Sequence, residues 1–303
     1  MHDMRTTINA FVFVVIATFI PAVALADILE TWESGTENAG VNGDLTWYGD
    51  TAAYDVASEV WPSGPDFDGD RSLRSENAVD DIPATVVTRI DSSLRFDKDL
   101  TWSVYFSGNT TTFSSNRRAD LILMADTNDV NDIEDPGTAN GINGYKVTLT
   151  DPYANATDNK PPSSHEDTTA LGDSLTLWSV DDTDHRWRVV GSVEVSSSSG
   201  MADGWNIEVK RSSTGDWYIG YSNGAYGTET GGWNNVGSDT VSMTAFSGTA
   251  VYGGVGWLAP DNTETDLDDF GFDNFQLIPE PATLSLIVLA GALLGFRRNF
   301  KKA

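Results

Sequence analysis

The sequence predicts an all-β body that folds as a β-sandwich in one domain. Three observations lead to this class: ten or more short runs rich in β-branched and aromatic residues, Gly, Asn, Asp, Ser and Pro clusters between them, and no sustained helical period. The chain also has enough apolar residues for a core, with 13 Phe, 10 Trp and 9 Tyr among 303 residues. We therefore expect a folded domain.

Composition excludes several function classes. The chain has 18 Lys and Arg against 45 Asp and Glu, and its net charge of −27 repels phosphate backbones, so it is not a nucleic-acid binder. It has no cysteine, which excludes disulfide scaffolds, thiol catalysis and Cys-ligated zinc. The classes that remain are those open to an acidic protein rich in aromatic residues.

The first 26 residues are typical of a secretory signal peptide. Arg5 is followed by an apolar run over 10–20, and the small residues Ala24 and Ala26 form a cleavage site. We expect signal peptidase to cut after Ala26. The alternative, an N-terminal membrane anchor, needs about 20 apolar residues, and this run is shorter.

The C-terminus carries three signals in a fixed order. They are the triplet Pro279, Glu280 and Pro281, an apolar run over 282–296, and a basic tail over 297–302 that contains Arg297 and Arg298. As a helix the apolar run rises about 22 Å, a little less than a hydrocarbon core. The basic residues hold their end of the helix on the cytoplasmic side, and the two prolines break regular structure ahead of it.

Together these three signals resemble the PEP-CTERM sorting signal of bacterial exported proteins. The resemblance covers residues 279–302 and implies that a membrane protease of the exosortase type recognises Pro279, Glu280 and Pro281. It implies a transient anchor in the inner membrane, followed by release of the body to the cell surface or extracellular matrix. The alternative is a plain tail anchor with an incidental proline break.

Between these ends, residues 27–278 show the strand pattern in order. The runs lie at 73–75, 84–90, 100–107, 119–125, 145–149, 174–178, 187–195, 205–211, 217–221 and 250–258. The runs 205–211 and 217–221 flank a Ser-Ser-Thr-Gly-Asp turn and predict a hairpin. The long polar segments at 126–143 and 151–172 are predicted to be loops. Both histidines of the body, His165 and His185, fall in polar segments and are expected in loops.

Four pieces in succession resemble the concanavalin A-like, laminin-G-type jelly roll. They are residues 69–74, 100–106, the hairpin at 205–221 and the last strand around 272–277. A galactose-binding-like jelly roll has a similar pattern. The resemblance implies a jelly-roll β-sandwich over 27–278, with a signal helix before it and a transmembrane helix after it.

The same resemblance also implies a structural calcium ion between the first and last strands, held by Glu33 and Asp273. The alternative is that both are ordinary surface carboxylates, because two acids fall short of the six to eight oxygens that calcium takes.

No catalytic constellation is recognised in the sequence. The paired acids of laminarinase-type relatives, Glu-x-Asp-x-x-Glu on one strand, occur nowhere, and Glu194 and Glu208 stand in strands without a partner acid two residues on. We therefore expect a protein that is not an enzyme. The rival hypothesis is a secreted glycoside hydrolase or lyase with carboxylates, or an Arg and Tyr pair, facing each other across a concave sheet.

Aromatic residues near a Gly-rich segment are the candidate ligand site. They are Trp217, Tyr218, Tyr226 and Trp233, whose rings could stack on sugars while Asn and Asp bind hydroxyls. Strand alternation, however, turns Trp217, Ile219 and Tyr221 toward the core. The leading hypothesis is an exported, non-enzymatic surface or matrix protein that binds polysaccharide, and the third hypothesis is a purely structural matrix component.

Overall fold

The computed structural model describes residues 28–32, 43–58, 71–75, 84–108, 118–136, 141–150, 165–166, 173–183, 185–195, 204–258 and 270–279. Several predictions fall outside this part of the chain: the signal peptide with Ala24 and Ala26, Glu33 of the calcium pair, and Glu280, Pro281, Arg297 and Arg298 of the sorting segment. Among the described residues, no helix has the length and apolar character needed to span a bilayer.

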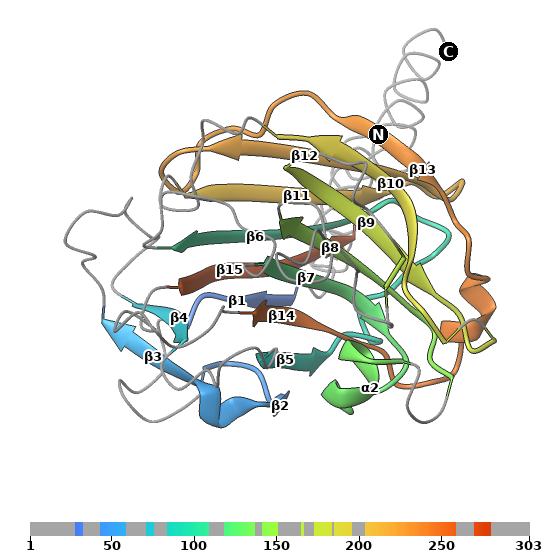
Figure 1. The fold of residues 1–303 in the computed structure, drawn as a ribbon, viewed down its shortest axis with the longest axis horizontal. Coiled ribbons are helices and arrows are strands. Elements are labelled where there is room, and N and C mark those ends of the chain that lie inside the picture. Colours follow the sequence, from blue (N-terminus) through green and yellow to red (C-terminus); the bar gives the residue numbers. More distant parts are fainter. Residues whose placement is uncertain are drawn as a thin grey trace, which may run out of the picture.

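The described residues form a two-layer sandwich of antiparallel sheets, which confirms the predicted all-β class (Figure 1). Sheet A has the strand order β13-β12-β11-β6-β15-β4-β3, and β1 pairs with β15 as well. Its strands are β1 (Ile28–Glu30), β3 (Tyr54–Ser58), β4 (Arg71–Ser75), β6 (Leu100–Gly108), β11 (Trp205–Arg211), β12 (Asp216–Asn223), β13 (Asn234–Ser238) and β15 (Phe270–Pro279).

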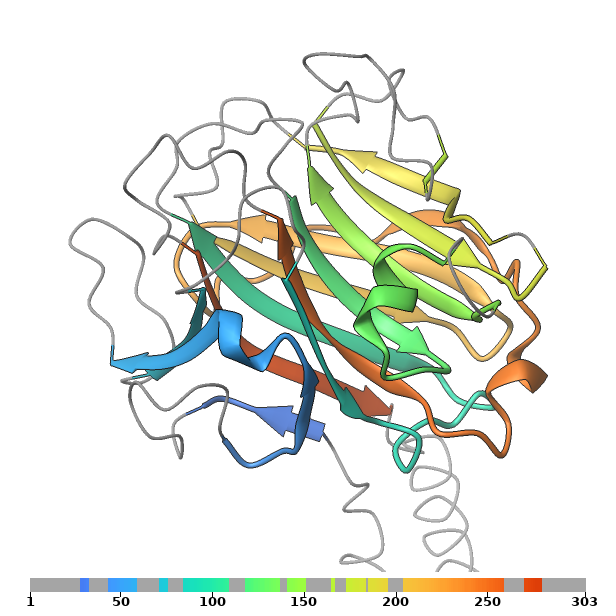
Figure 2. The same ribbon diagram turned by 60° about the horizontal axis from the view of Figure 1, so that its bottom comes forward.

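Sheet B has the order β10-β9-β8-β7-β14-β5-β2. Its strands are β2 (Trp47–Gly49), β5 (Ala84–Arg89), β7 (Arg118–Ala125), β8 (Gly144–Thr150), β9 (Ser174–Val180), β10 (Arg188–Glu194) and β14 (Tyr252–Leu258). The described helices are short: α2 (Val130–Glu134), η2 (Thr51–Ala53) and η4 (Met243–Phe246). Figure 2 shows α2 in front of sheet B, where Val130 and Ile133 pack on Val87 and Ile122.

The main core lies between the two sheets and is built by strand alternation. On β12, Trp217 and Ile219 point inward and are fully buried, whereas Tyr218 lies on the outer face and is half-buried. Inside, Trp217 stacks on Trp102 of β6 at 5.7 Å between ring centroids and meets Tyr145 of β8 at 4.8 Å. These three rings join both sheets at one end of the sandwich.

On one side of the sandwich, edge strand β10 of sheet B lies directly against edge strand β13 of sheet A (Figure 1). A Cβ atom added at Gly191 would lie 2.0 Å from the carbonyl oxygen of Val236, and one at Gly237 would lie 2.9 Å from Cγ1 of Val190. Both distances are shorter than real Cβ contacts, and Gly237 also has a positive φ of 131°. Glycine at these two positions therefore permits the close approach of the two edges.

Candidate functional site

The indole of Trp233 lies on the outer face of sheet A, over Gly220 of β12. A Cβ atom at Gly220 would lie 3.4 Å from Cε3 of Trp233 and 3.5 Å from Cζ3, so the ring is in contact distance of the strand. The Trp233 side chain nevertheless remains 45% exposed, which makes it one of the few large exposed apolar side chains in the described chain. One ring face is thus supported while the residue stays open to solvent.

Hydrogen bonds fix the segment that carries this ring. The Gly231 amide donates to the carbonyl oxygen of Tyr221 at 2.8 Å, and Nδ2 of Asn234 donates to the carbonyl oxygen of Ile219 at 3.2 Å. Oγ1 of Thr230 donates to Oε2 of Glu208 at 2.7 Å, which sets a carboxylate beside the indole. Attachments to β11 and β12 on both sides of Trp233 make the arrangement preorganised.

We call this surface the Trp233 platform and define it by Trp233, Thr230, Glu208 and Tyr218. Tyr218 lies two residues from Gly220 on the same face of β12, about 7 Å along the strand. The platform therefore combines two aromatic rings with a carboxylate and a hydroxyl. Such groups can stack on a ligand ring and accept hydrogen bonds from its hydroxyls.

The other two aromatic candidates have packing roles. Trp217 is fully buried, and its Nε1 donates to Oδ1 of Asp239 at 2.8 Å, so its inclusion among the ligand-binding candidates is corrected: strand alternation turns the ring into the core. Tyr226 is half-buried and meets the buried ring of Tyr105 edge-on at 5.7 Å. Tyr226 thus covers Tyr105 beside the platform.

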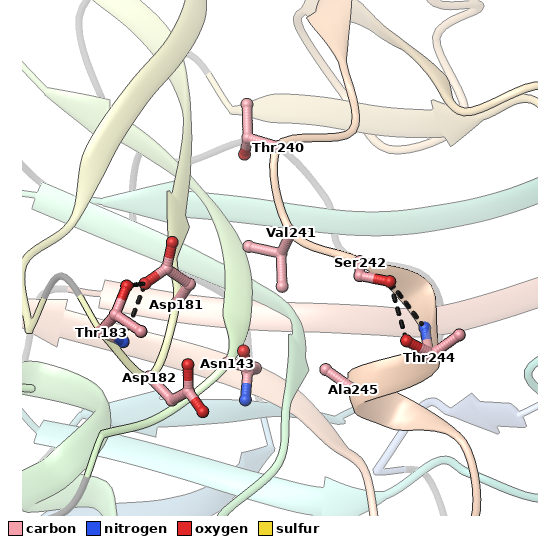
Figure 3. Close-up of a pocket in the computed structure, with 9 residues that line it drawn as sticks. All are labelled: Asn143, Asp181, Asp182, Thr183, Thr240, Val241, Ser242, Thr244 and Ala245. Carbon is pink, nitrogen blue, oxygen red and sulfur yellow. Dashed lines mark hydrogen bonds between the residues drawn. The ribbon is translucent and has the colours of Figure 1, made fainter.

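A pocket of about 490 Å³ lies between the turn that joins β9 to β10 and the segment that joins β13 to η4 (Figure 3). Its polar lining consists of two carboxylates, one amide and four hydroxyls, from Asp181, Asp182, Asn143, Thr183, Thr240, Ser242 and Thr244. The sequence did not single out this pocket, because its walls come from three separate segments of polar turn residues.

A cluster of buried charges occupies the outer face of sheet B. Asp120 of β7 is 4% exposed and lies 3.2 Å from both Nε of Arg118 and Nζ of Lys146. Oγ1 of Thr148 also donates to Oδ1 of Asp120 at 2.6 Å. Burial by itself would raise the pKa of Asp120, but the two cations and this hydrogen bond outweigh it and hold that pKa below its usual value.

Helix α2 adds a second carboxylate to this cluster. Glu134 accepts a hydrogen bond from Oγ1 of Thr85 at 2.5 Å. Burial raises the pKa of Glu134 to about 7 against the opposing effect of Arg118, and burial lowers the pKa of Lys146 to about 8. The cluster therefore holds two carboxylates whose pKa values are shifted in opposite directions, a pattern that often marks functional sites.

His165 also belongs to this region, where it forms an isolated bridge with Trp187 in the otherwise polar segment predicted as a loop. It is fully buried between Trp178, edge-on at 5.2 Å, and Trp187, stacked at 6.4 Å. Burial lowers its pKa well below the usual value, and the positive charges of Lys146 and Arg118 lower it further. The polar sequence around His165 gave no sign of this aromatic enclosure.

Of the two residues predicted to hold calcium, Asp273 lies in the described part of the chain. Asp273 is fully buried at a β-bulge in β15, where its Oδ1 accepts the amide of Asn274 at 2.7 Å. The buried acid near the start of the domain is Glu30, which accepts the amides of Trp32 at 2.8 Å and Leu45 at 3.0 Å. Within the described ranges, no three His, Asp or Glu side chains come together as metal ligands. With Glu33 outside these ranges, the pair stays a prediction.

Comparisons with known proteins return solved structures only. No family model and no curated protein matches the chain. The VIP36 exoplasmic/lumenal domain in its Ca2+/Man3GlcNAc-bound form is 13% identical, with a TM-score of 0.41 over 75% of this chain and 84% of that one. The lectin from Bauhinia forficata in complex with GalNAc is 10% identical, with a TM-score of 0.43 over 83% and 97%. A GH131 β-glucanase catalytic domain from Podospora anserina is 13% identical, with a TM-score of 0.42 over 82% and 93%. Likenesses of this size carry no argument about ligand or activity.

Proposed function

We propose that this chain is an exported, non-enzymatic protein of the bacterial cell surface or matrix, with a concanavalin A-like jelly roll that binds polysaccharide at the Trp233 platform. The observation that carries the proposal is the exposed indole of Trp233, supported from below at Gly220 and flanked by Glu208. An aromatic face offers apolar contact to the C–H face of a sugar ring, and a carboxylate accepts hydrogen bonds from sugar hydroxyls. An open surface of this kind suits a polymer chain that continues beyond the contact.

Replacing Trp233 with alanine is expected to weaken polysaccharide binding about tenfold, because a central aromatic contact typically contributes more than about 1 kcal/mol. Co-sedimentation of the purified full chain with a panel of polysaccharides measures the effect. Tyr48→Ala is the matched control, since Tyr48 is an exposed aromatic residue, 37% exposed, on β2 of the other sheet. Equal binding by the wild type and Trp233→Ala would refute the platform. No binding to any glycan by the wild type would favour the structural matrix component.

The export part of the proposal rests on the two terminal segments and on the position of the triplet, which begins where β15 ends at Pro279. Changing Pro279, Glu280 and Pro281 to alanine should trap the protein in the inner membrane, because the exosortase-type protease loses its recognition segment. Cell fractionation followed by immunoblotting measures this. As a control, a chain that ends after Pro281 lacks the apolar segment and should leave the membrane fraction. Normal surface delivery of the alanine variant would contradict the sorting assignment.

The rival hypothesis, a polysaccharide-degrading enzyme, gains support from one observation. Asp120 and Glu134 lie in the same charge cluster on sheet B, with pKa values shifted down and up respectively. We favour the non-enzymatic reading because Asp120 is only 4% exposed beneath its neighbours. We expect neither reducing ends nor unsaturated sugars to appear when the protein is incubated with a glycan panel. Product that forms with the wild type and disappears with Glu134→Gln would establish the enzyme instead.

A further inference from the structure

We propose that the pocket between the β9–β10 turn and the β13–η4 segment is a second saccharide subsite, and that it binds a sugar residue bearing a free amino group (Figure 3). The proposal rests on carbohydrate binding as the proposed function, but it uses a different place on the molecule and a different ligand chemistry. Its cavity of about 490 Å³ is within the range of about 300–1,000 Å³ that small-molecule sites occupy.

One wall of the pocket is tied to the core of the sandwich. The hydroxyl of Tyr145 on β8 accepts the amide of Thr240 at 2.8 Å and the amide of Val241 at 2.7 Å. The preceding residue is Asp239, whose carboxylate accepts two hydrogen bonds from buried side chains. Nη2 of Arg211 donates to Oδ2 at 2.5 Å, and Nε1 of Trp217 donates to Oδ1 at 2.8 Å. Three buried side chains, Tyr145, Arg211 and Trp217, therefore hold the segment from 239 to 241, so this wall needs little reorganisation when a ligand binds.

The opposite wall is fixed by local hydrogen bonds. Oδ1 of Asp181 accepts the amide of Thr183 at 2.8 Å and its hydroxyl at 2.6 Å, which closes the turn between β9 and β10. Nδ2 of Asn143 donates to Oδ2 of Asp126 at 2.8 Å. This bond uses an amide hydrogen and leaves the side-chain oxygen of Asn143 as an acceptor for a ligand.

The side chains that line the pocket favour a ligand that carries a positive charge. Carboxylates, an amide oxygen and hydroxyls line the pocket, and no Lys, Arg or His is among the described residues that form it. Figure 3 shows the Asp182 side chain beside Asn143, without a dashed bond to the other residues drawn. Asp182 is exposed, so its carboxylate can pair with an incoming ammonium group. A uronate would bring a like charge to Asp181 and Asp182 and is expected to be rejected.

The test uses the purified full chain and isothermal titration with three trisaccharides: glucosamine, N-acetylglucosamine and a uronic acid. We expect the wild type to bind the glucosamine trimer at least tenfold more tightly than the other two. Asp182→Asn keeps the shape of the side chain and should weaken that binding about tenfold, because it removes the charge that strengthens a hydrogen bond to an ammonium group. Glu194→Gln removes one negative charge at the far end of β10 and should leave the affinity unchanged.

The outcomes separate this inference from the proposed function. If Asp182→Asn binds the glucosamine trimer as the wild type does, or if the wild type does not bind that trimer, the pocket assignment is overturned. Polysaccharide binding that depends on Trp233 would stand in either case. If instead Trp233→Ala has no effect on polysaccharide binding while Asp182→Asn abolishes trimer binding, the pocket is confirmed and the platform fails. A preference of the wild type for the uronate trimer would also overturn the inference.

Discussion

Replacing Asp120 with asparagine is expected to lower the free energy of unfolding by about 3–5 kcal/mol, because it removes the carboxylate that two buried cations share. Arg118 and Lys146, which share Asp120, are 4% and 1% exposed, so water cannot replace it. Urea denaturation at pH 7 measures the loss. Asp91→Asn is the control: its ion pair with Arg89 is at the surface, where the Arg89 side chain is 61% exposed, and such pairs contribute about 0–1 kcal/mol.

The loss should also depend on pH. The pKa of Asp120 is lowered in the folded state, so its stabilising effect is complete above its unfolded pKa of about 3.9 and disappears as the pH falls through the lower folded value. The difference in stability between the wild type and Asp120→Asn should therefore narrow below about pH 4. An equal difference at pH 3 and pH 7 would show that the carboxylate charge does not stabilise the cluster.

Replacing Trp217 with alanine is expected to lower the free energy of unfolding by about 3–5 kcal/mol, the usual cost of truncating a buried tryptophan. The ring fills the space between Trp102 and Tyr145, and its Nε1 binds Asp239. The variant therefore loses core contacts and an anchor of the pocket wall together. Denaturant unfolding followed by fluorescence measures the change. Trp233→Ala, at an exposed position, should cost far less, and a similar cost for both would contradict the burial of Trp217.

Much of the fold could be predicted because the long strands carry their own pattern. All ten predicted runs correspond to strands of the structure, and the hairpin of β11 and β12 has the expected turn. The short strands β1, β2, β3 and β13 were missed, since each has only three to five residues and none stands out by its β-branched and aromatic content. The helix α2 was missed inside the predicted loop 126–143 for the same reason, although Asp129 caps its first turn.

The sequence identified candidate residues by type and local setting, but it could not tell which of them are exposed. Trp233 was recognised from aromatic residues near glycines, but Trp217 has the same local setting and is buried. The buried charge cluster was not predicted, because in the sequence Asp120 and Lys146 look like the solvent-facing residues of two alternating strands. Their burial depends on α2 and on His165 with its tryptophan neighbours. These contacts join residues that are distant in the sequence, and no local pattern encodes them.

The contact between β10 and β13 has a consequence for how copies of this protein meet. Exposed sheet edges present unpaired amides and carbonyls that invite strands from other chains and lead to aggregation. At Gly191 and Gly237 the two edges leave no space even for a methyl group, so a foreign strand has no room to enter between them. Among the described strands, the others that pair with a single neighbouring strand are β1, β2 and β3. Any assembly by strand addition would therefore proceed from those strands.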